Sequence, residues 1–74
     1  MSLAGVLASH LARVEQAMKA ARDGLREAAS VARLENIAGV DPEVLETVAA
    51  VTDANRGGVE RMAEKVKGAG GHRP

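Results

Sequence analysis

Apolar residues recur at alternating intervals of four and three along the first half of the chain. They are Leu7, Leu11, Val14, Met18, Ala21, Leu25, Ala28 and Ala32. This is the heptad spacing of helices that pack against other helices, because it lines up side chains along one stripe of an α-helix. The pattern predicts one long helix from about residue 3 to residue 35.

The two sides of this stripe differ. With Leu11 and Leu25 at heptad position a, the g positions carry no charged side chain; they are His10, Ala17, Gly24 and Val31. The charged residues fall at b, c, e and f, which predicts that they face solvent; they are Arg13, Glu15, Lys19, Arg22, Asp23, Arg26, Glu27 and Arg33. A stripe widened on one side is typical of a helical bundle. Small residues in the middle of the stripe predict that a second helix approaches closely there; they are Ala17, Ala21, Gly24 and Ala28.

A turn is predicted where the heptad pattern stops. Gly39 suits a left-handed residue after a helix, Asp41 suits an N-cap, and Pro42 suits the first helical position. Ile37 and Val40 are expected to fold under this turn and close that end of the core.

The second apolar series runs across a glycine pair. Its members are Val44, Val48, Val51, Asn55, Val59, Met62 and Val66. At about 100° per residue they share one face, so a single helix from about residue 42 to residue 67 is favoured. Gly57-Gly58 is also a stop signal, and a break there stays open as the alternative. Residues 68–74 are glycine-rich and are expected to form a flexible tail.

Two helices joined by a short turn predict an all-α fold, an antiparallel helical hairpin forming one domain over residues 1–67. The chain has only 74 residues, with no aromatic residue and no cysteine. A core of this size is marginal alone and usually needs disulfides, a metal or a partner. We therefore expect a homodimer in which two hairpins form a four-helix bundle.

Charge and hydropathy limit the partners. Ten basic and ten acidic residues cancel, so we expect neither nucleic acid nor a membrane surface as a partner. The apolar stretch from Leu3 to Ala8 has no basic region before it, which argues against a secretory signal or a membrane span. A cytoplasmic protein is expected, with export without a cleaved signal as the open alternative.

No pattern of catalytic or ligand-binding residues is found. The tail glycines follow a helix instead of opening one, unlike a phosphate loop. His10 and His72 are far apart, and no metal-ligand spacing occurs. No serine or threonine lies in a motif with a general base. We expect no enzyme activity, metal, cofactor or small-molecule substrate.

The sequence thus favours a protein interaction or assembly module that acts through helix packing and associates with itself. The residues predicted to form the interface are Leu7, Leu11, Val14, Met18, Leu25, Val48, Val51 and Met62. A small adaptor or secreted hairpin that pairs with a different protein is the alternative. It would belong to a secretion, docking or phage-type assembly.

Overall fold

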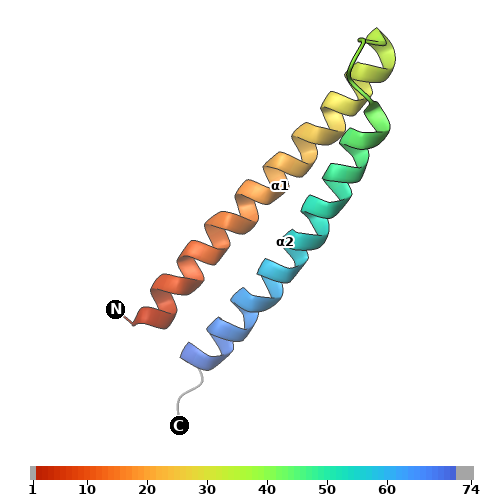
Figure 1. Cartoon of the computed structure of the whole chain (residues 1–74). Coiled ribbons are helices and arrows are strands. Elements are labelled where there is room, and N and C mark those ends of the chain that lie inside the picture. Colours follow the sequence, from red (N-terminus) through yellow and green to blue (C-terminus); the bar gives the residue numbers. More distant parts are fainter. Residues whose placement is uncertain (1, 72–74) are drawn as a thin grey trace.

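The computed structural model describes residues 2–71, and these form two helices and no strand. Helix α1 spans Leu3–Glu35 and helix α2 spans Pro42–Gly71. They pack side by side in opposite directions, with the turn at one end of the molecule and both termini at the other (Figure 1). The hairpin measures 59 × 17 × 14 Å. The predicted all-α antiparallel hairpin is therefore confirmed, and the predicted four-helix bundle remains a prediction.

Each helix begins at a side-chain cap. The Ser2 hydroxyl accepts a hydrogen bond of 3.0 Å from the Gly5 amide at the start of α1. The Asp41 carboxylate accepts one of 2.9 Å from the Glu43 amide at the start of α2, where Pro42 is the first helical residue. These bonds satisfy amides that have no partner inside the helix.

The end of α1 differs in one respect from the prediction. Asn36 takes the left-handed conformation next to the helix, at φ 50°, and its amide donates to the carbonyl of Ala32. Gly39 also has positive φ, at 84°, but it lies within the turn. Asparagine tolerates this conformation better than most residues, so the helix ends before the glycine.

Helix α2 runs through Gly57-Gly58 without interruption, as the shared face of its apolar residues predicts. It continues past the expected end at Lys67 to Gly71. Residues 72–74 of the predicted tail lie outside the described residues.

Candidate interaction surface

The two helices touch along a line of residues that we call the contact seam. Its members are spaced four and three apart in each helix and are all buried or half-buried. In α1 they are Ala4, Ala8, Leu11, Glu15, Met18, Arg22, Leu25, Ala29 and Ala32. In α2 they are Pro42, Leu45, Ala49, Thr52, Arg56, Val59, Ala63 and Val66. The seam shares Leu11, Met18, Leu25 and Ala32 with the predicted heptad stripe. The other four residues of that stripe each precede a seam residue by one position; they are Leu7, Val14, Ala21 and Ala28.

Alanine alone makes up the buried apolar core of the hairpin. The apolar residues classed as buried are Ala29, Ala32, Ala49 and Ala63. No large side chain in the described chain is fully buried. Alanines at the seam let the helices approach closely, but each removes little apolar surface from water. The intramolecular contact therefore leaves most of the large apolar side chains uncovered.

Ionic residues fill the middle of the seam. Arg56 donates through Nη1 to Glu15 Oε2 at 3.2 Å and through Nε to Asp53 Oδ1 at 3.0 Å. Arg22 donates to the same Asp53 oxygen at 2.6 Å. The hydrogen bond from Arg22, reinforced by the one from Arg56, lowers the pKa of Asp53 below its ordinary value. This network joins the two helices at mid-length.

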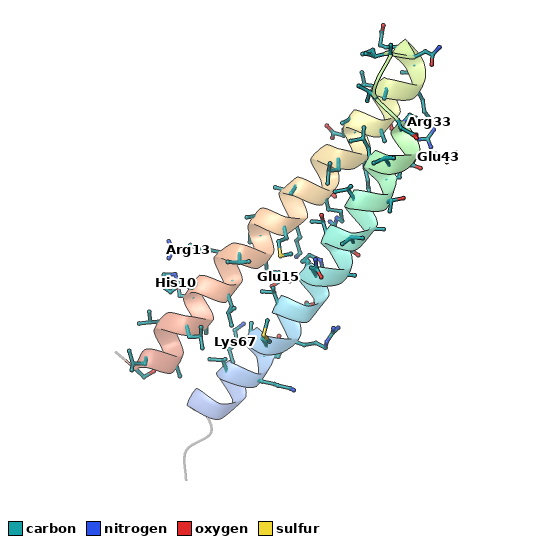
Figure 2. The ribbon with its side chains drawn as sticks, in the orientation of Figure 1. His10, Arg13, Glu15, Arg33, Glu43 and Lys67 are labelled. Atoms are coloured by element: carbon teal, nitrogen blue, oxygen red, sulfur yellow. The ribbon has the colours of Figure 1, made fainter. Side chains whose placement is uncertain are left out.

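The network corrects one expectation from the heptad pattern. Glu15 and Arg22 were expected to face solvent, yet their side chains are only 14% and 19% exposed. Figure 2 shows Glu15 between the ribbons of the two helices. Long charged side chains bury their stems while their ends find partners, so charge alone does not assign a position to the surface.

Charged side chains continue on one broad surface of the hairpin, which we call the charged face. Its residues each follow a seam residue by one position: Lys19, Arg26, Arg33, Glu46, Asp53 and Glu60. Arg33 binds both carboxylate oxygens of Glu46, at 2.5 and 2.8 Å. This hydrogen bonding lowers the pKa of Glu46 below its ordinary value.

The opposite surface is the apolar face. Its residues each precede a seam residue by one position. In α1 they are Leu7, Val14, Ala17, Ala21, Gly24, Ala28 and Val31, and in α2 they are Val44, Val48, Val51, Asn55, Gly58 and Met62. One residue is a rotation of about 100° around a helix. Because the helices are antiparallel, the same step from the seam leads to the same side of the hairpin in both.

The predicted interface residues divide between the seam and the apolar face. Leu11, Met18 and Leu25 are half-buried in the seam. The other five lie on the apolar face, where they are 43–54% exposed: Leu7, Val14, Val48, Val51 and Met62. The small residues expected to admit a second helix are not in the hairpin contact either, and a Cβ added to Gly24 would meet no atom within 4 Å.

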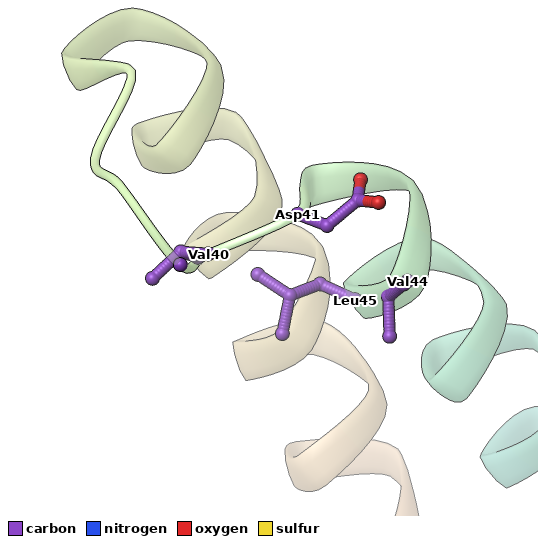
Figure 3. A pocket seen from close by; sticks show the side chains of 5 residues that line it. Val40, Asp41, Val44 and Leu45 are labelled. Carbon is purple, nitrogen blue, oxygen red and sulfur yellow. The ribbon is translucent and has the colours of Figure 1, made fainter.

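The turn end of the molecule corrects another expectation. Ile37 and Val40 do not close the core, since they are 52% and 42% exposed. Val40 instead lines a pocket together with Gly39, Asp41, Val44 and Leu45 (Figure 3). The pocket walls are largely aliphatic and hold one carboxylate. It adjoins the apolar face at Val44.

Among the described residues, no group of three or more histidine, cysteine, aspartate or glutamate side chains is placed to hold a metal ion. Neither α1 nor the described part of α2 has a segment with the length and hydropathy of a transmembrane span. No family model, curated protein or solved structure matches the chain. The uncovered apolar face is thus the main surface feature of this hairpin.

Proposed function

We propose that this chain is a self-association module: two copies bury their apolar faces against each other and form a four-helix bundle, and the protein acts through this packing instead of catalysis. One observation carries the proposal. The buried apolar residues of the single chain are alanines, whereas the seven large apolar side chains of the apolar face are 43–56% exposed. A contiguous exposed apolar surface usually marks an interface.

The directions of the two packing surfaces support a bundle. A helix of a four-helix bundle contacts two neighbours, and its apolar stripe points between them toward the bundle centre. Here Leu11, Met18 and Leu25 belong to the contact seam and lie on its side next to the apolar face. The hairpin thus has the surfaces of one half of such a bundle.

A second copy suits the surface better than an unrelated protein for two reasons. The residues at the outer edge of the apolar face on α1, Arg13 and Glu27, have opposite charges, so the edge is complementary to itself. Two-fold dimers are also the commonest assemblies of soluble chains. A different helical partner is the alternative outcome of the experiment below.

The experiment compares two variants that add the same charge two residues apart. Val14 lies on the apolar face, whereas Gln16 points outward on the other side of α1. Val14→Glu buries an unpaired carboxylate in the dimer and should raise the dimer Kd by at least about a hundredfold. Gln16→Glu should leave it unchanged within about twofold. Sedimentation equilibrium measures both.

A wild-type chain that stays a folded monomer in this experiment would argue for a different partner. Equal dimerisation of the wild type and Val14→Glu would contradict the proposed surface.

A further inference from the structure

Lys65 lies one position before the seam residue Val66 and is a charged residue on the apolar face itself, near the end of α2. The outer edges of that face, where side chains point away from the other helix, carry three further charged residues in the described chain. These are Arg13 and Glu27 on α1 and Arg61 on α2, each at a position that points away from the other helix. Figure 2 shows Arg13 on the side of α1 that faces away from α2. Such flanking positions hold the ion pairs between neighbouring helices in coiled coils and bundles. No ion pair within the hairpin involves any of the three.

Two hairpins can stack on their apolar faces with two-fold symmetry in two ways. In the same-end stack the two turns lie at the same end of the dimer, and in the opposite-end stack they lie at opposite ends. With turns at the same end, each α1 lies along α2 of the second copy, and the symmetry axis runs along the bundle. Rotation about that axis does not move a residue along the bundle. Residues of α1 and α2 that are level within one hairpin are therefore also level between the two copies.

The same-end stack brings like charges together. The bond between Arg22 and Asp53 shows which parts of the two helices are level. Arg13 lies nine residues before Arg22, and Arg61 lies eight residues after Asp53. At about 1.5 Å per residue, Arg13 and Arg61 are level to within about 2 Å. Arg13 would therefore face Arg61 of the second copy on both sides of the dimer.

The opposite-end stack brings unlike charges together. Each α1 then lies antiparallel to α1 of the second copy. If the symmetry axis passes Ala20, which is midway between Arg13 and Glu27, each Arg13 faces Glu27 of the second copy. This gives two ion pairs in place of two repulsive pairs.

The centre of the apolar face fits the same axis. Ala20 is level with Asn55, so the axis also brings the Asn55 side chains of the two copies toward each other. A carboxamide both donates and accepts hydrogen bonds and can pair with its own copy. Ala17, Ala21 and Gly24 surround the axis on α1, where small side chains permit close approach.

From this charge pattern we infer that the second copy binds with its turn at the opposite end, with Arg13 paired to Glu27 across the dimer and Asn55 at the symmetry axis. The inference rests on the self-association proposed above. It specifies which of the two possible dimers forms.

Reversal of the charge at Arg13 should change the dimer Kd in opposite directions for the two stacks. In the opposite-end dimer, Arg13→Glu faces Glu27 of the second copy and should raise Kd about tenfold at low salt. In the same-end dimer it would face Arg61 and lower Kd. The double variant Arg13→Glu and Glu27→Arg should return Kd close to the wild-type value. Tighter dimerisation of Arg13→Glu would overturn the inference.

A distance measurement tests the same inference independently of charge. The chain has no cysteine, so Ala38→Cys places a single spin label in the exposed turn. The opposite-end dimer predicts a label separation on the order of 50 Å. The same-end dimer predicts one on the order of 20 Å. A dimer with the short distance overturns the inference alone, whereas a monomer overturns the proposed function as well.

Discussion

The charged face and the apolar face of this hairpin differ in how many of their side chains find partners within the chain. On the charged face, Glu46 and Asp53 of α2 both find arginine partners on α1. On the apolar face, the aliphatic side chains of the two helices lie in the same surface and stay about half exposed. The ion pairs thus help to set the register of the two helices, whereas the chain leaves its apolar face uncovered.

The expected stabilisation also differs between the two faces. Solvent-exposed ion pairs contribute little, because water and salt screen them. Complete covering of a half-exposed valine or leucine contributes about 1 kcal/mol. Burial of the apolar face should therefore outweigh the charged face in stability, and the following predictions test that order.

The largest effect is expected where a charge enters the apolar side of α1. Leu25 is half-buried at the seam and borders the apolar face, while its neighbour Arg26 lies on the charged face. Leu25→Asp should cost more than about 3 kcal/mol, because the carboxylate would lose its water. Arg26→Asp should cost less than about 0.5 kcal/mol. Urea unfolding of both variants gives the comparison, and similar losses would mean that the two faces are not distinct.

A smaller loss of stability is expected at acidic pH, and it should arise from the carboxylates of the charged face. The pKa values of Glu46 and Asp53 are lowered by their arginine partners. Their stabilisation is complete above the ordinary values of 4.5 and 3.8, and it is lost as the pH falls through the lower values of the folded state. The melting temperature should drop between pH 6 and pH 3.

The matched control for the acid prediction removes both carboxylates. A Glu46→Gln and Asp53→Asn double variant should melt lower than the wild type at pH 6 and lose less of its stability toward pH 3. An equal drop in the double variant would assign the acid sensitivity to other groups.

The smallest effect is expected at the two adjacent glycines of α2. Gly57 lies on the outer side of the helix, whereas Gly58 lies on the apolar face. Within the hairpin an added Cβ would meet only the Arg61 guanidinium, at 3.5 Å from Gly57 and 3.8 Å from Gly58, which is ordinary contact. Gly57→Ala should stabilise by up to about 1 kcal/mol through higher helix propensity.

The Gly58→Ala variant distinguishes a monomeric hairpin from a dimer that packs closely at Gly58. It should give the same gain in a monomeric hairpin and a smaller gain or a loss in a dimer that packs closely at this position. Thermal melts of both alanine variants at high protein concentration make this comparison, and equal gains would argue against close packing at Gly58.

The sequence was sufficient to predict the two helices, because their apolar periodicity is long and their end signals are strong. The apolar face that continues across Gly57-Gly58 correctly predicted an unbroken helix. Ile37 and Val40 were misplaced, because the conformation of a turn depends on contacts that a periodic pattern does not contain. Gly39 was the predicted left-handed residue after α1, but Asn36 adopts that conformation earlier in the chain.

The contact seam could not be assigned from the sequence alone. A heptad stripe marks the average direction of all apolar contacts that a helix makes. If a helix has two neighbours, this average lies between them and matches neither. Glu15 and Arg22 were therefore expected to face solvent, and Ala8 and Ala29 were not part of the heptad stripe, although all four lie in the contact seam. Alanine contributes little to a hydrophobic pattern, and the pattern does not show where ionic residues find partners.

The most direct test of the central claim is the melting temperature of the wild-type chain over a hundredfold range of concentration, with the mass measured at both limits. For a self-associating chain, the melting temperature should rise with concentration, because association stabilises the folded state by mass action. The mass should be twice 7.6 kDa at the upper limit. A constant melting temperature, with a mass of 7.6 kDa throughout, would contradict self-association.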